Sequence, residues 1–107
     1  MLHHAARALV FGLALALPAA ATAAGKTHAV RIEGMKFEPE RLEAAVGDTI
    51  TWTNRDVVPH TVTGAGRSLE SGTIAPNGKW TYRVRAKGEI AYVCRFHPMM
   101  KGVLVAK

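Results

Sequence analysis

The chain has 107 residues, with 14 Lys and Arg against 8 Asp and Glu, five histidines and one cysteine. This length allows one small domain, and a single cysteine excludes an intramolecular disulfide. A basic chain can meet nucleic acid, anionic lipid or an acidic protein. Because there is no nucleic-acid motif and no basic amphipathic helix, we expect an acidic protein partner, no nucleic acid and no membrane span. A solvated basic surface without a partner is the alternative.

Residues 1–24 have the features of a cleaved secretory signal peptide. Arg7 precedes ten apolar residues, Ala8 to Leu17, and Pro18 ends that run before a small-residue stretch. Ten residues at about 1.5 Å each cannot cross about 30 Å of hydrocarbon, so we do not expect a membrane anchor. Cleavage is expected after Ala23 or Ala24, followed by export to the periplasm. The domain is then residues 25–107, where loss of Arg7 leaves 13 basic residues against 8 acidic ones, a net charge of +5.

Residues 25–107 show the two-residue alternation of β-strands and no helical period long enough to predict a helix. The alternation groups these residues on shared strand faces: His28, Val30 and Ile32; Ile50 and Trp52; Val58, His60 and Val62; Trp80, Tyr82 and Val84; Ile90, Tyr92 and Cys94; Val103 and Val105. We expect His60 and Cys94 to point inward with the apolar residues of their sets. Turn residues separate these segments. Seven or eight short strands of this spacing predict a small all-β domain, an antiparallel β-sandwich. We expect Trp52 and Trp80 in its core.

Metal-ligating residue types gather in two of these segments. Cys94, His97, Met99 and Met100 fall within seven residues, and His60 follows a proline on an earlier segment. Taken singly, an inward His, a buried Cys and a Met are ordinary packing residues. Taken together, one Cys, two His and a weak axial Met form the ligand set of a blue-copper electron-transfer site. Zinc prefers four strong donors, so the pattern favours copper.

These residues resemble the cupredoxins, the family of type 1 blue-copper proteins, and most of all the amicyanin-like members. The resemblance lies in residues 35–38, 46–52, 54–55, 59–60 and 94–100, and the compact Cys-x2-His-x2-Met loop is its most specific part. It implies a Greek-key sandwich with one type 1 copper ion. It also implies that His60, Cys94 and His97 are the equatorial ligands and that Met100 is the axial ligand.

The chain departs from the family pattern at three places. Thr61 stands where members often have Asn, and its hydroxyl is a candidate to tie the two ligand loops together. Residues 64–79 do not match the pattern well. Met99 stands where an aromatic residue is usual, before the expected axial ligand.

The leading hypothesis is a periplasmic carrier that cycles between Cu(II) and Cu(I). We do not expect an enzyme, because a closed four-ligand site leaves no open position for a substrate. A copper-binding and delivery protein is the second hypothesis, and a metal-free β-sandwich interaction module is the third.

We expect a monomer that exchanges electrons with acidic redox proteins through the edge of His97. The resemblance implies an apolar docking patch around that edge, formed by Pro59, Pro98, Met99 and Met35. Three basic residues close in sequence to the ligands are candidates for its rim: Arg55, Arg95 and Lys101.

Overall fold

The structure is a computed structural model that describes residues 25–107, so the predicted signal peptide lies outside the described residues. The eight strands are β1 (Thr27–Ile32), β2 (Phe37–Glu38), β3 (Arg41–Ala44), β4 (Thr49–Asn54), β5 (Thr63–Gly64), β6 (Lys79–Arg83), β7 (Gly88–Cys94) and β8 (His97–Ala106). One short 3₁₀ turn, η1 (Ala65–Arg67), follows β5. Within residues 25–107, no helix has the length and apolar character needed to span a bilayer.

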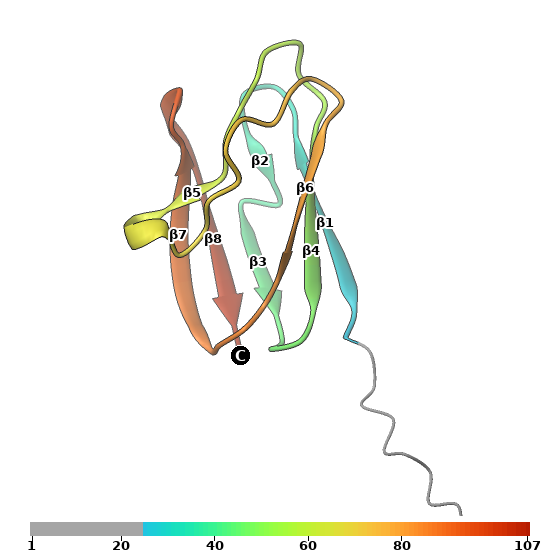
Figure 1. Ribbon diagram of the computed structural model, residues 1–107, viewed down its shortest axis with the longest axis vertical. Coiled ribbons are helices and arrows are strands. Elements are labelled where there is room, and N and C mark those ends of the chain that lie inside the picture. Colours follow the sequence, from blue (N-terminus) through green and yellow to red (C-terminus); the bar gives the residue numbers. More distant parts are fainter. Residues whose placement is uncertain (1–24) are drawn as a thin grey trace, which may run out of the picture.

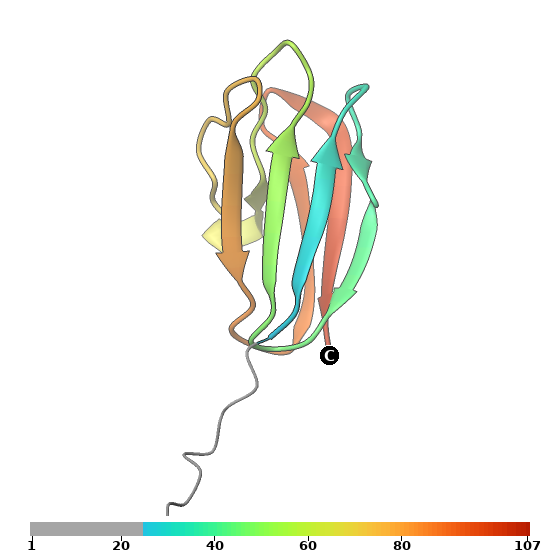
Figure 2. The same cartoon turned by 90° about the vertical axis from the view of Figure 1, so that its right-hand side faces the viewer.

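The strands form two four-stranded sheets that pack face to face (Figures 1 and 2). One sheet has the order β2-β1-β4-β6 and the other β3-β8-β7-β5. The predicted all-β sandwich of seven to eight strands is confirmed. However, β1 pairs with β4 in parallel and β3 pairs with β8 in parallel, so both sheets are mixed rather than wholly antiparallel. Alternation within a strand marks its faces but carries no information about the direction of its neighbour.

The core between the sheets is built around Trp52 and Tyr92. The Trp52 Nε1–H donates a hydrogen bond to the Tyr92 hydroxyl at 3.2 Å, so both polar atoms are paired inside the core. Phe37 meets the Tyr92 ring edge to face at 4.8 Å. Gly102 on β8 makes this packing possible, because a Cβ at that position would collide with the Tyr92 ring. Trp52 is buried as predicted, whereas Trp80 is half-buried and packs against it from β6.

One strand prediction was wrong. The segment from Val58 to Val62 is not a strand; it is a loop that makes one isolated bridge, in which His60 and Ile74 exchange backbone hydrogen bonds of 3.1 and 2.7 Å. The alternating side chains of this segment are buried because the loop packs against the domain, and not because the segment pairs with a neighbouring strand.

The alternation of Val103 and Val105 does not identify the buried face of β8. Val103 and Val105 are half-buried, while Gly102, Leu104 and Ala106 are buried. Both faces of this strand carry apolar residues, so alternation alone could not distinguish them.

The ligand-bearing loops lie at one end of the sandwich. The β1–β2 loop, the chain that follows β4 and the β7–β8 turn are at the upper end in Figures 1 and 2, and the C-terminus is at the opposite end.

The opposite end is organised by Asp48, which is buried. Its carboxylate accepts hydrogen bonds from the backbone N–H groups of Ala45 and Lys26, both at 2.9 Å, and pairs with His28 Nε2 at 2.8 Å.

These bonds lower the pKa of Asp48 from its ordinary 3.8 to about 2, first through the Ala45 amide, then through His28 and the Lys26 amide. A carboxyl with a depressed folded-state pKa adds stability above its unfolded pKa and loses it as the pH falls toward the folded value. Asp48 should therefore contribute to acid unfolding between about pH 4 and pH 2.

We expect Asp48→Asn to lower the free energy of unfolding at pH 7 and to flatten its fall between about pH 4 and pH 2. Urea unfolding at several pH values measures both effects. Glu89→Gln, which removes an exposed carboxylate from β7, is the control and should change the slope much less. An unchanged slope in Asp48→Asn would assign the acid transition to other groups.

Candidate metal centre

Cys94 ends β7 and His97 begins β8, and the tight turn between the two strands brings these residues opposite each other. The β7–β8 ladder shifts register between Val93 and Cys94, and Cys94 then pairs directly with His97. Such a bulge re-aims the side chains that follow it. Cys94 is fully buried and His97 is half-buried, so the turn places one donor inside the domain and the other at its surface.

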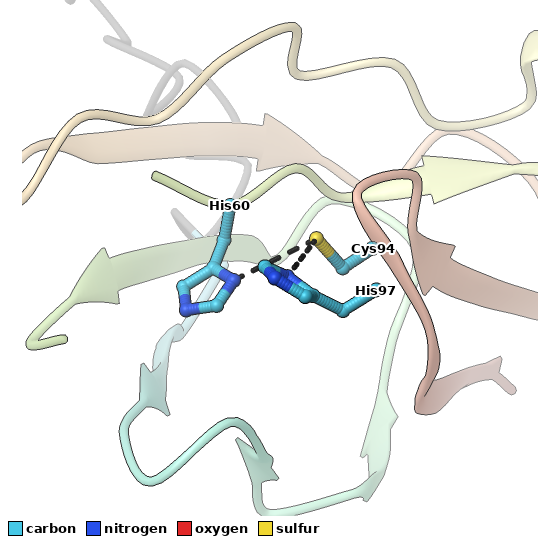
Figure 3. Close-up of side chains that lie close together, drawn as sticks. All are labelled: His60, Cys94 and His97. Carbon is cyan, nitrogen blue, oxygen red and sulfur yellow. Dashed lines mark hydrogen bonds between the residues drawn. The ribbon is translucent and has the colours of Figure 1, made fainter. Parts of the chain in front are cut away.

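His60 reaches the same point from the loop after β4. Its Nδ1 atom lies 3.6 Å from the Cys94 Sγ atom, and His97 Nδ1 lies 3.8 Å from the same sulfur (Figure 3). The three donor atoms all lie within 4.8 Å of one another. The structure thus brings together three of the four predicted ligands.

This spacing fits a metal ion. With a metal–sulfur bond of about 2.3 Å and a metal–nitrogen bond of about 2.0–2.1 Å, lengths known for zinc, bond angles of about 110–120° place sulfur and nitrogen about 3.5–3.8 Å apart. The observed distances of 3.6 and 3.8 Å fall in that range. One thiolate and two imidazoles can therefore hold one ion without moving the backbone, and these donor types suit copper.

The two methionines of the loop have opposite environments. Met100 on β8 is only 4% exposed, whereas Met99 is 91% exposed. A thioether that binds a buried metal must itself face the interior, and Met100 meets this condition.

Thr61 ties the two ligand loops together, as expected from the sequence. Its hydroxyl accepts a hydrogen bond of 2.7 Å from the Arg95 backbone N–H, and its own backbone N–H donates to Cys94 Sγ at 3.4 Å. The second bond fixes the position of the sulfur beside the loop that carries His60.

Two further residues organise the site and were not recognised from the sequence. Asn54, fully buried at the end of β4, donates to the carbonyl oxygens of Val58 and Ile74 at 2.9 and 3.0 Å, and so shapes the loop that carries His60. Asp56 accepts a hydrogen bond of 2.7 Å from His60 Nε2. The one sequence signal for Asp56 was its position, an acidic residue four residues before a candidate ligand histidine.

Asp56 has an ionised carboxylate in spite of its partial burial. Burial raises the pKa of Asp56, but hydrogen bonds from the Met35 backbone, His60 and the Gly34 backbone together hold that pKa below its ordinary 3.8. An ionised carboxylate only accepts hydrogen bonds, so His60 carries its proton on Nε2. The Nδ1 lone pair is then free and faces Cys94.

Known proteins with this arrangement are found by sequence and by structure. The family model described as a cupredoxin-like domain matches residues 5–106. Amicyanin-alpha of Methylorubrum extorquens is 33% identical over 94% of this chain and 99% of its own length. Amicyanin of Paracoccus denitrificans is 36% identical over 83% of this chain and 72% of its own length.

Comparison with solved structures also finds amicyanins. An amicyanin variant in the Cu(I) form superposes with a TM-score of 0.73 at 30% identity, over 81% of this chain and 88% of that one. The same fold recurs in a copper-containing nitrite reductase from Thermus scotoductus at 23% identity, where the match covers only 22% of the larger chain. Sequence, fold and donor set agree, and the chain belongs to the cupredoxin family of blue-copper electron-transfer proteins, within which it is similar to amicyanins.

Proposed function

We propose that this protein is a periplasmic one-electron carrier in which His60, Cys94 and His97 are the equatorial copper ligands and Met100 is the axial ligand. The observation that carries the proposal is the convergence of the Cys94 sulfur and two imidazole nitrogens at 3.6 and 3.8 Å. Periplasmic export rests on the signal-like residues 1–24.

When bound, copper supplies the one-electron redox chemistry, and the residues of the chain keep the site nearly unchanged between oxidation states. Cys94 and His60 are held at zero exposure, which excludes water from one side of the site. Thr61 fixes the sulfur by its backbone N–H, and Asp56 fixes the His60 ring. A site held by such bonds rearranges little on electron transfer, which favours fast exchange.

This burial favours a carrier over a copper-delivery protein, because delivery requires the ligands to open toward a recipient. We expect the copper-loaded protein to take up one electron in the presence of a Cu(I) chelator and to regain its visible absorption fully on reoxidation. Chelator absorbance and bound copper are measured after each cycle. Transfer of copper to the chelator upon reduction would instead support delivery.

The axial assignment can be tested with two neighbouring variants. We expect Met100→Gln to shift the reduction potential and the visible spectrum with copper still bound, because the axial bond is long and weak. Met99→Gln is the matched control and should leave both nearly unchanged, since the Met99 side chain is almost wholly exposed. The reverse pattern would reassign the axial ligand to Met99.

The half-buried His97 opens onto a groove that forms the docking surface in this proposal. The groove has a volume of about 670 Å³ and is lined by Gly34, Met35, Lys36, Phe37, Glu40, His97, Pro98, Met99, Met100 and Lys101. Met35 and Met99 are 41% and 91% exposed, so two thioether side chains flank the histidine in solvent. Flexible apolar side chains of this kind can pack against a partner without polar groups that must lose water.

The charged rim differs from the one expected from the sequence. Of the three basic residues named there, Lys101 lines the groove, and Lys36 joins it. Arg95 is paired with Glu70 at 2.9 Å, and Arg55 lines a separate depression beside Arg31. Two lysines against Glu40 leave the groove net basic, which favours an acidic partner.

We expect electron transfer with an acidic redox protein to slow as salt rises, because the Debye length shortens to about 10 Å near 0.1 M. Met99→Lys should slow transfer further without changing the copper spectrum, because it replaces apolar contact area with a hydrated charge. Stopped-flow kinetics measure both effects.

The matched control is Val46→Lys, which adds the same charge at an exposed valine in the β3–β4 turn, outside the groove. It should leave the rate at high salt nearly unchanged. If Met99→Lys and Val46→Lys behave alike, the groove is not the docking surface.

A further inference from the structure

Asp56 lies between the buried ligand His60 and the β1–β2 loop, and its carboxylate is hydrogen-bonded to both. The Oδ2 atom accepts from His60 Nε2 at 2.7 Å and from the Met35 backbone N–H at 3.0 Å, and the Oδ1 atom accepts from the Gly34 backbone N–H at 2.7 Å. The Asp56 backbone N–H donates to the Asn54 side chain at 2.9 Å. Three donors therefore converge on one carboxylate.

The β1–β2 loop adopts an unusual conformation to make these bonds. Gly34 and Met35 have consecutive φ angles of 65° and 61°, in the left-handed region. Glycine enters this region readily, whereas a residue with a side chain such as Met35 does so at a cost. The conformation turns both backbone amides toward the same anion, as in other anion-binding turns. The loop is thus shaped around the Asp56 carboxylate.

We propose that Asp56 is a positioning residue for the copper site, which keeps His60 in the tautomer that can bind metal and favours Cu(II) over Cu(I). This inference rests on the proposed electron-transfer function. The hydrogen bond to Nε2 fixes the ring orientation and makes Nδ1 a better donor. The carboxylate also places a negative charge behind the ring, which stabilises the more highly charged copper ion.

The same carboxylate holds one wall of the docking groove. Gly34 and Met35, whose amides it binds, line that groove together with His97. Asp56 therefore connects the buried ligand His60 to the wall beside the half-buried ligand His97.

An amide cannot replace the carboxylate in this position. Asparagine has one acceptor oxygen and an NH₂ group that only donates, whereas three N–H groups point at Asp56. In Asp56→Asn, the NH₂ group must replace either Oδ2, where it faces His60 Nε2 and the Met35 amide, or Oδ1, where it faces the Gly34 amide. If it faces His60, Nε2 becomes the acceptor and the proton moves to Nδ1, the atom that would bind copper. Asp56→Glu keeps the charge and both acceptor oxygens.

The first measurement uses the copper-free protein. We expect nitrogen NMR of the His60 ring to show one tautomer, with the proton on Nε2, in the wild type and in Asp56→Glu. Asp56→Asn should populate the Nδ1–H tautomer where its NH₂ group faces His60, and should speed hydrogen exchange of the Gly34 amide where its NH₂ group faces that amide instead. A wild-type ring with its proton on Nδ1, or an Asp56→Asn variant in which neither the His60 tautomer nor the exchange of the loop amides changes, would overturn the positioning role.

The second measurement uses the copper-loaded protein. Asp56→Asn should weaken Cu(II) binding about tenfold more than Cu(I) binding, which for a one-electron couple raises the reduction potential by about 59 mV. Asp56→Glu should recover most of this change. Glu40→Gln is the control, because it removes a carboxylate that lines the docking groove but is not the one bonded to His60, and it should shift the potential less.

The two measurements distinguish failure of this inference from failure of the proposed electron-transfer function on which it rests. Failure of the wild type to bind copper would refute the proposed function, while the copper-free tautomer would still decide the positioning role. Equal potentials in Asp56→Asn and Glu40→Gln would overturn the electrostatic part of the inference.

Discussion

The hydrogen bonds of Thr61 are the interactions on which the metal end of this domain depends. The loop that carries His60 and the turn that carries Cys94 and His97 are more than 30 residues apart in the sequence, and Thr61 joins them through the Arg95 amide at 2.7 Å and the Cys94 sulfur at 3.4 Å. Backbone amides that hold a sulfur tune its redox chemistry as well as its position. The geometry of the site is therefore a property of the loops and of the sandwich that fixes them.

Two polar networks extend this arrangement away from the sulfur. Asn54 closes the loop after β4 by bonds to Val58 and Ile74, and Asp56 connects His60 to the β1–β2 loop. Buried polar groups are costly unless they are fully bonded, and within residues 25–107 no buried side-chain nitrogen or oxygen lacks a partner. One end of the sandwich can thus be polar and rigid, while the core beneath it is apolar.

Much of the fold could be predicted because alternation reports burial directly. It marked β4 and β7 and placed Trp52, Tyr92 and Cys94 in the interior, as observed. It could not give the parallel pairing of β1 with β4, because pairing is decided by distant segments. It was wrong for residues 58–62, where a loop buries alternating side chains, and it could not identify the buried face of β8, because both faces are apolar.

The candidate ligands could be predicted from residue types and spacing, and the family resemblance added the choice of Met100. Asp56 and the precise role of Asn54 could not be predicted, because their partners are a ring nitrogen, two backbone amides and two carbonyl oxygens brought close only by folding. The most direct test of the central claim is the visible spectrum after addition of one equivalent of Cu(II) to the wild type and to Cys94→Ser. The account predicts an intense thiolate-to-copper charge-transfer band in the wild type and none in Cys94→Ser. The same spectrum in both proteins would contradict it.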